Sequence, residues 1–228
     1  MEIDIKNKAL LRNVKLRMVV ENKTSIEEVS ELSLMNKTFI KEDAKLNLEE
    51  IYKLKNLKKL SIKFFTINDE IIKVLNKLEK LEILEIYMCK FETTERLNGN
   101  NIKNIYIYNA ENLNLDILDK NKVKAIRIEN SGLVDFYKFV KFEKIEKLEV
   151  IRCPVISIPK LNLLKSIKEL YLQEIDLQFD LEINALEKLE FISLNGSNVN
   201  DREEYIQKIK NQNNYIKVEF KNDNRPTE

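Results

Sequence analysis

Histidine is absent from this sequence of 228 residues. The absence excludes Ser-His-Asp and Cys-His nucleophile systems, imidazole metal ligands and the commonest general base. Glycine occurs only at Gly99, Gly132 and Gly196, which lie too far apart to form a phosphate-binding loop. We therefore expect no catalytic residue, no metal site and no cofactor.

Excess charge, disulfide frameworks and long hydrophobic runs are also missing. With 39 Lys+Arg against 38 Asp+Glu the formal charge is +1, and no basic block follows a phosphate backbone, so we do not expect nucleic acid as a partner. Two cysteines agree with a reducing compartment. The opening "MEIDIKNKAL" is no secretion signal, and no stretch is long and apolar enough to span a membrane. We expect a cytoplasmic monomer, or a secreted protein if a signal has been removed.

A pattern of aliphatic residues, apolar-x-x-apolar-x-apolar, recurs along most of the chain. Its eight starts are Val29, Leu57, Leu81, Ile102, Val123, Ile145, Ile167 and Leu189. The first, fourth and sixth positions of every unit are Ile, Leu or Val. Apolar-x-apolar is strand periodicity, and the spacing of roughly 22 residues leaves too little room for an ordinary crossover helix in each unit. The strands are therefore predicted to stack in parallel as turns of a solenoid.

This pattern resembles the leucine-rich repeat family, in particular its 22-residue class, over residues 29–199. The best matches are "LEKLEILEIYMCKF" and "IPKLNLLKSIKELYL". The resemblance implies an α/β fold: a right-handed solenoid with a parallel sheet on its concave side and short helices or turns on its convex side. It also implies a single repeat domain.

The ninth position of each unit departs from the family, in which an asparagine ladder is usual. The column reads Lys37, Phe65, Cys89, Ala110, Ser131, Cys153, Ile175 and Ser197. The turns must satisfy their buried amides by other means, so we expect local irregularity. The same column predicts that Cys89 and Cys153 are packed in the core. Three strands, on the order of 14 Å, separate them, so they form neither a disulfide nor a metal pair.

The ends of the chain look like caps for this array. Residues 1–28 form either an N-terminal cap, with a strand in "KALLRNVKLRMVV", or a degenerate first repeat. Residues 200–220 predict a capping helix at 200–214 and a last strand, "YIKVEF", and residues 221–228 predict a disordered tail. The segments 47–56 and 68–80 each begin with asparagine and have acidic residues in the first turn, a pattern that predicts a helix in both. Around "ISIPKLNLLKS" we expect turns and brief helical pieces.

The third, fifth and seventh positions are left to line the concave face. There the middle units carry tyrosine and arginine, the residue types that most often supply binding energy at interfaces. We therefore predict a partner-binding site at Glu85, Tyr87, Tyr106, Tyr108, Arg127 and Tyr171. The competing interpretation is that these residues only stabilise the strands, because tyrosine and opposite charges suit any sheet.

Two functions from different classes remain open. The first is a cytosolic protein-protein interaction module that acts as a scaffold or regulatory subunit; the second is the recognition part of an exported surface or effector protein. The glycan acceptor patterns at 22–24, 36–38 and 195–197 arise readily in an asparagine-rich chain and do not decide between them. An enzyme is the remote alternative, because Glu129 and Glu149 have Arg127 and Lys147 as neighbours and look like a charge ladder.

Overall fold

The chain divides into two compact units, Met1–Lys122 and Val123–Glu228, and the boundary falls at the start of a repeat. Each unit therefore contains four of the eight repeat starts. The single domain over 29–199 and the capping roles of 1–28 and 200–220 stay predictions. The computed structural model describes residues 4–36, 48–98, 101–120, 122–157, 164–177, 183, 186–199 and 201–221. The predicted disordered tail, except Lys221, and most of the "ISIPKLNLLKS" segment lie outside these ranges.

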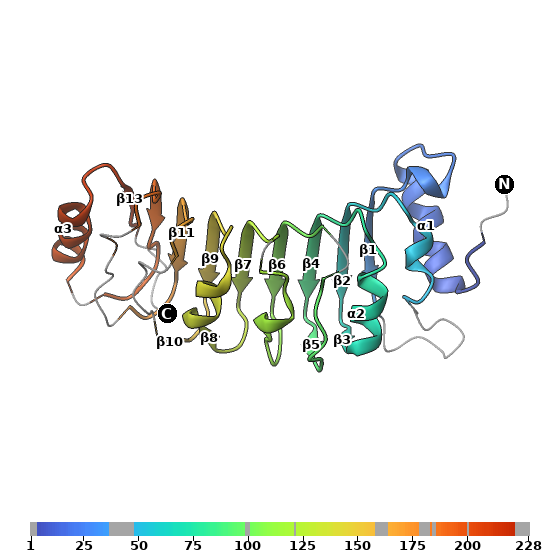
Figure 1. Ribbon diagram of the computed structural model, residues 1–228, viewed down its shortest axis with the longest axis horizontal. Helices are drawn as coiled ribbons and strands as arrows, with labels where there is room; N and C mark the ends of the chain where they lie inside the picture. Colours follow the sequence, from blue (N-terminus) through green and yellow to red (C-terminus); the bar gives the residue numbers. More distant parts are fainter. Residues whose placement is uncertain are drawn as a thin grey trace, which may run out of the picture. The chain divides into compact units, whose positions relative to one another are not determined.

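Unit 1 is built on a parallel sheet with one strand from each repeat (Figure 1). Its strands, in spatial order, are β1 (Glu31–Met35), β2 (Lys59–Lys63), β4 (Ile83–Tyr87) and β6 (Asn104–Tyr108). Their register keeps equivalent positions opposite one another: Leu32 pairs with Leu60, Leu60 with Leu84, and Leu84 with Ile105. The repeat of the sequence is thus a repeat of strands.

Unit 2 has the same construction. Its strands, in spatial order, are β7 (Ala125–Glu129), β9 (Lys147–Ile151), β11 (Glu169–Gln173), β12 (Phe191–Ser193) and β13 (Lys217–Glu219). All of these strands run parallel, and the fourth positions again lie opposite one another, as Ile126 and Leu148 do. The last strand predicted from "YIKVEF" is β13.

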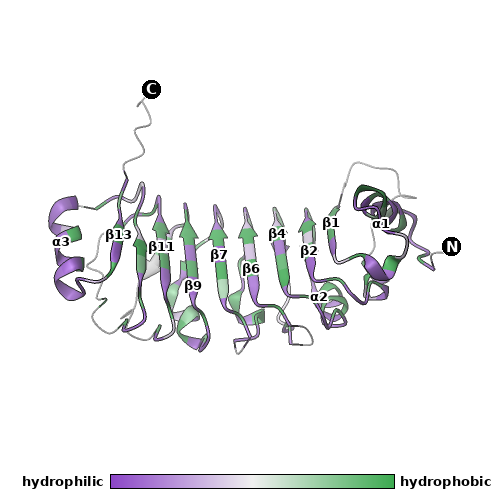
Figure 2. Cartoon of the chain, turned by 90° about the horizontal axis from the view of Figure 1, so that it is seen from above, coloured by the Kyte–Doolittle hydropathy of each residue, from purple (hydrophilic) through white to green (hydrophobic). Residues whose placement is uncertain are grey.

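The aliphatic columns form the core, as predicted. Every first, fourth and sixth position of the eight repeats is buried, with at most 4% of its surface exposed. Figure 2 shows hydrophobic and hydrophilic colours within the strands, which is the alternation expected of a sheet with one face in the core. Full burial of one such side chain is worth about 1.5–3 kcal/mol, so these columns supply much of the stability.

We call the opposite surface, formed by the third, fifth and seventh positions, the sheet face. Most of its side chains are half-buried or exposed. Four are buried instead: Ser61, Glu149, Ile151 and Ser193. The prediction that the whole face is open to solvent is wrong at these positions, because longer side chains on adjacent strands lie over them. Gln173, for example, donates a hydrogen bond to the Ser193 hydroxyl at 2.7 Å.

The predicted strand near the N-terminus is a helix, α1 (Lys8–Val20), which lies beside β1 (Figure 1). The side chain of Asn7 caps it by accepting a hydrogen bond from the Leu10 amide at 2.8 Å. Leu10, Val14 and Met18 form its buried stripe. Their spacing of four is helical, and the other apolar residues of the segment, such as Leu11 and Leu16, hide it in the sequence.

The other predicted helices are confirmed in two of three cases. Helix α2 (Asp69–Leu75) begins after Asn68, and α3 (Arg202–Gln212) begins after Asp201; both caps accept a backbone hydrogen bond. The prediction over 47–56 is wrong, because the described residues there hold only a 3₁₀ turn at Ile51–Lys53. Glu50 does not cap this turn; its carboxylate accepts the Asn7 amide hydrogen instead.

Short elements connect the strands on the side away from the sheet face, as the predicted fold class requires. They are β3 (Thr66–Ile67), β5 (Lys90–Phe91), β8 (Val134–Asp135), β10 (Val155–Ser157) and 3₁₀ turns at Leu115–Ile117 and Phe136–Lys141; a further 3₁₀ turn, Ile26–Glu28, precedes β1. β3 pairs with β5, and β8 with β10. The last 3₁₀ turn buries Phe136 and Phe139, whose rings meet edge to face with centroids 5.3 Å apart.

The turn after each strand is regular, although irregular turns were expected. The eighth position adopts a left-handed conformation, with φ from 49° to 68°, at Phe64, Met88, Asn109, Asn130, Arg152, Glu174 and Gly196. This conformation costs a residue other than glycine or asparagine roughly 1–2 kcal/mol. Four of the seven residues bear that cost, so the turn geometry is imposed by the stacking of the repeats.

Cysteine and serine replace the missing asparagine ladder at the ninth position. The Cys153 thiol accepts a hydrogen bond from the Ser131 amide at 3.4 Å and donates one to the Ile151 carbonyl at 3.2 Å. Cys89 bridges the Phe65 amide and the Tyr87 carbonyl in the same way. Both thiols are free and buried, as predicted, and burial raises the pKa of each. The protonated thiol is the form that can donate to a carbonyl.

Serine makes the same connection at Ser197, whose hydroxyl accepts the Ile175 amide hydrogen at 3.3 Å and donates to the Leu172 carbonyl at 2.7 Å. We therefore expect Cys153→Ser to be tolerated and Cys153→Val to lower the free energy of unfolding by roughly 1–3 kcal/mol, because valine leaves buried polar groups unpaired. Urea denaturation of the two variants measures the difference. A valine variant as stable as the serine variant would show that the thiol only fills space.

Candidate functional site

Two of the tyrosines predicted to bind a partner form a stack on the sheet face of unit 1. Tyr87 on β4 and Tyr108 on β6 are opposite one another in register, and their rings lie 4.6 Å apart and nearly parallel, at 4°. The Lys63 ammonium on β2 lies over the Tyr87 ring, 4.8 Å from its centroid. In the described part of the chain Lys63 has no carboxylate partner. Two aromatic rings and a cation thus share one row of the sheet.

The next row of the same face holds Glu85 and Tyr106, which are register partners. The carboxylate of Glu85 is bound by the Lys59 ammonium at 2.7 Å. Hydrogen bonding to Glu85 raises the pKa of Lys59, against the effect of desolvation. This ion pair neutralises the row, so the uncompensated positive charge of the cluster lies on Lys63. The structure brings these four predicted residues, Glu85, Tyr87, Tyr106 and Tyr108, together in unit 1.

Sequence reasoning missed three apolar side chains at the ends of these strands. Met35 ends β1, Phe64 follows β2, and Met88 follows β4; their exposed fractions are 42%, 44% and 51%. The amides of Phe64 and Met88 donate to the carbonyls of Tyr87 and Tyr108, which places both residues beside the stacked tyrosines. For Phe64 and Met88 the available signal was an apolar eighth position in two consecutive units, where the other units carry polar residues or glycine.

We call the unit 1 set the tyrosine cluster. Its members are Met35, Lys63, Phe64, Glu85, Tyr87, Met88, Tyr106 and Tyr108. It combines rigid aromatic area, exposed apolar side chains and one cation without a carboxylate partner in the described ranges. Rigid aromatic area and exposed apolar side chains are common at protein-binding surfaces.

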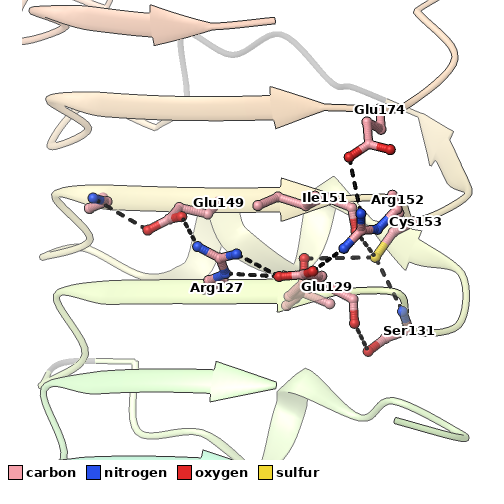
Figure 3. Close-up of polar contacts among 10 residues, drawn as sticks. Arg127, Glu129, Ser131, Glu149, Ile151, Arg152, Cys153 and Glu174 are labelled. Atoms are coloured by element: carbon pink, nitrogen blue, oxygen red, sulfur yellow. Dashed lines mark hydrogen bonds and ion pairs between the residues drawn. The ribbon is translucent and has the colours of Figure 1, made fainter. Parts of the chain in front are cut away.

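Arg127 lies in a different environment, an ion-pair network on the sheet face of unit 2 (Figure 3). Its guanidinium binds Glu149 at 3.0 Å and Glu129 at 2.5 Å. Arg152, which follows β9, joins Glu129 to Glu174. The charge ladder expected for Glu129 and Glu149 is therefore present, and Arg127 is already bound within the chain.

Tyr171 lies at the other side of the same network. It lies opposite Glu149 in the strand register, and its ring contacts the Phe191 ring with centroids 5.2 Å apart. The Lys147 ammonium sits over the Tyr171 ring at 4.6 Å and binds Glu149 at 3.3 Å. Desolvation lowers the pKa of Lys147, but its hydrogen bond to Glu169 and the charges of Glu149, Tyr171 and Glu169 outweigh this effect and raise the pKa well above its ordinary value. The predicted residues of unit 2 are thus joined to one another mainly by charge.

The network shifts the pKa of the Glu129 carboxyl group. Burial raises the pKa of Glu129, but the hydrogen bonds and charges of Arg127 and Arg152 outweigh this effect and lower the pKa below 4.5. A carboxyl group held in its ionised form is poorly suited to donate a proton near neutral pH.

Linkage makes this shift testable. A carboxyl group whose pKa is lower in the folded state than in the unfolded state stabilises the fold at pH values above its unfolded-state pKa. This stabilisation is lost as the pH falls through the folded-state pKa. We expect Glu129→Gln to lower the free energy of unfolding by about 1 kcal/mol at pH 7, and the gap to close as the pH falls below the lowered pKa. Urea titrations across this range measure it. Glu143→Gln, an exposed position without a described ion pair, is the control and should show no such closing.

Comparison with known structures identifies this architecture. No protein-family model matches the sequence, and no curated protein matches it either. Among solved structures, the chain is similar to internalin C2 from Listeria monocytogenes str. 4b F2365, with 15% identity, a TM-score of 0.59 and coverage of 94% of this chain and 93% of that chain. The chain has the leucine-rich repeat fold. Its assignment to the 22-residue class stays a prediction.

Two further similarities have lower TM-scores. An internalin (InlF) from the same Listeria strain is 13% identical to this chain, with a TM-score of 0.42. The alignment covers 95% of this chain and 89% of the internalin chain. A leucine-rich repeat protein from Leptospira interrogans is 14% identical, with a TM-score of 0.34. The alignment covers 86% of this chain and 73% of the Leptospira chain. At these identities the similarity concerns the fold alone.

In a leucine-rich repeat chain the sheet face is made of side chains that the repeat itself leaves free to vary. The tyrosine cluster and the unit 2 network occupy such positions, and a group of three or more His, Cys, Asp or Glu side chains able to hold a metal ion is not found among the described residues. None of the described helices is long and apolar enough to span a membrane.

Proposed function

We propose that this leucine-rich repeat chain is a non-catalytic interaction module that binds a protein partner on the sheet face. The observation that carries the proposal is the tyrosine cluster, in which the Tyr87–Tyr108 stack lies beside Lys63 and the exposed side chains of Phe64 and Met88. The stack offers a large rigid surface whose conformational freedom is already restricted. A partner that covers it therefore loses little entropy in ordering it.

We expect the tyrosine cluster of unit 1 to contribute most of the binding and the predicted residues of unit 2 to contribute less. Arg127 is bound to two carboxylates, so a partner has to displace an existing ion pair to use it. Lys147 likewise already covers Tyr171. Such satisfied groups favour specificity and association rate more than affinity. Glu85, Tyr87, Tyr106 and Tyr108 are the residues we expect to carry most of the binding energy.

The non-catalytic part of the proposal rests on the state of the carboxylates. Glu129 and Glu149 are each bound by cationic side chains, and the lowered pKa of Glu129 keeps it ionised. A pair of carboxyl groups with clearly different pKa values, one of them raised, is the usual arrangement for acid-base catalysis. The described network has the opposite character at Glu129, where Arg127 and Arg152 favour the ionised carboxylate.

The cellular role proposed with this binding is that of a monomeric cytosolic scaffold or regulatory subunit. Export as a recognition domain is the alternative. Cell fractionation with an antibody against the chain distinguishes them: recovery in the cytosolic fraction supports the first role, and recovery outside the cell or at its surface supports the second.

Oxidative footprinting tests the binding surface. Hydroxyl radicals label exposed tyrosine, methionine and phenylalanine side chains, and a bound partner protects those that it covers. With a partner captured from the native cell, we expect protection of Phe64, Met88 and Tyr106. Tyr137 and Tyr215, 56% and 91% exposed and outside the sheet face, are internal controls that should stay labelled. Protection of the controls alone would contradict the proposal.

A further inference from the structure

Helix α1 has an exposed stripe of basic and aliphatic side chains. Lys8, Arg12, Lys15, Leu16, Val19 and Val20 are all exposed. Their spacings of three and four residues place them on one side of the helix, away from the buried Leu10, Val14 and Met18. Helix α1 lies beside β1, the first strand of the unit 1 sheet (Figure 1).

The stripe is divided along the helix axis. Its first half is basic, and its second half is apolar: the exposed fractions of Leu16, Val19 and Val20 are 63%, 74% and 67%. Exposed aliphatic side chains on a protein surface are normally scattered singly, and a contiguous group of them marks an interaction site. Three adjacent aliphatic side chains at this exposure form such a group, and their i, i+3, i+4 spacing is typical of anchors that pack against a second helix.

The charge of the stripe identifies the chemistry of its partner. Lys8, Arg12 and Lys15 have no carboxylate partner among the described residues, and no acidic side chain lies in the stripe. The neighbouring Arg17 is different, because it is bound by Glu21 and by Glu31 of β1. We propose that the α1 stripe is a docking site for an acidic amphipathic helix of a partner protein, with apolar residues on one half and carboxylates on the other.

A second copy of the chain fits the stripe poorly. A two-fold interface brings the same surface of both copies together. Parallel helices would place the six basic side chains of two stripes against one another, and antiparallel helices would cover each apolar half with the cations of the other. In the first arrangement the like charges repel one another. In the second the cations lose water without gaining a carboxylate partner.

A membrane surface fits less well than a protein. A helix that lies on a membrane presents apolar side chains along its whole length and cations around its edge. In α1 the charge and the apolar side chains succeed one another along the axis on the same side, and the stripe contains no aromatic anchor. This docking site is independent of the proposed function, since it lies on α1 and not on the sheet face.

The probe that tests the proposal is a fluorescein-labelled synthetic helix with leucines on one half of one side and glutamates on the other half. Fluorescence anisotropy with the full chain should show saturable binding that weakens as salt is added. Val19→Gln and Arg12→Glu should each weaken it about tenfold. Lys73→Glu, which changes an exposed cation on α2, is the matched control and should leave the affinity unchanged.

A charge exchange separates specific docking from general attraction. The Arg12→Glu/Lys15→Glu variant should prefer a peptide with lysines in place of the glutamates, while the unmodified chain should reject it. Circular dichroism verifies that each variant stays folded.

Absence of saturable binding, or equal binding by all variants, overturns the proposal. Two other results also overturn it by assigning the stripe to another occupant. One is sedimentation of the chain with phosphatidylserine vesicles that Val19→Gln abolishes. The other is a concentration-dependent dimer in analytical ultracentrifugation that the same change abolishes.

Discussion

Replacing Leu148 by alanine is expected to lower the free energy of unfolding by roughly 2–5 kcal/mol. Leu148 is completely buried at the fourth position of its repeat and lies in register between Ile126 and Leu170. Its removal leaves a cavity in the middle of a stacked array, where each repeat contacts only its neighbours and the defect cannot be bypassed. Urea denaturation followed by circular dichroism measures the loss.

Tyr106→Ala is the comparison for this experiment. Tyr106 lies on the sheet face and is only half-buried, so we expect its removal to cost about 1 kcal/mol or less. A larger loss for Tyr106→Ala than for Leu148→Ala would show that the two faces of the strands have been assigned the wrong way round.

The second large effect concerns binding. Removing a central anchor of an interface typically costs at least ~2 kcal/mol, which is roughly a thirtyfold loss of affinity. We expect losses of this size for Tyr87→Ala and for Tyr106→Ala once the partner is in hand. For Arg127→Ala we expect a smaller loss, because the arginine is already bound to Glu129 and Glu149. Isothermal titration calorimetry gives each affinity directly.

Interpretation of this series requires that the variants stay folded, which thermal denaturation checks. Tyr137→Ala provides a control in which an exposed aromatic side chain is removed from outside the sheet face. Unchanged affinity in both tyrosine variants and in Arg127→Ala would place the site elsewhere and leave the tyrosines as ordinary strand residues.

The core of the fold could be predicted because a single periodic pattern determines it. The aliphatic fourth and sixth positions of each unit lie on one side of a strand, the first position precedes that strand, and stacking of the units buries all three. The predictions for Ile126 and Leu170 therefore hold without any knowledge of their neighbours. The ninth position followed for the same reason, and Cys89 and Cys153 are buried there.

Elements that depend on contacts between distant residues were harder to predict. The apolar run in α1 fits a strand as well as a helix until the position of β1 shows which side is buried. Over 47–56, the expected helix is reduced to a 3₁₀ turn where Glu50 is tied to the Asn7 amide. Local propensity is a weak guide wherever such tertiary contacts decide the structure.

The candidate site was only partly visible in the sequence. The pattern placed Glu85, Tyr87, Tyr106 and Tyr108 on one face, because their positions follow from the repeat. It did not reveal which charges are compensated, since ion pairs between strands depend on side-chain rotamers and not on periodicity. Thus Arg127 and Lys63 looked alike in sequence, although one is held by two carboxylates and the other lies over a tyrosine ring.

The most direct test of the proposed binding surface is a photo-crosslinking measurement with the native partner. A photoreactive phenylalanine derivative is placed at position 106, in the tyrosine cluster, and in a second variant at position 137, outside the sheet face. The proposed function predicts a covalent product with the partner from position 106 and none from position 137. Crosslinking from position 137 with none from position 106 would contradict it.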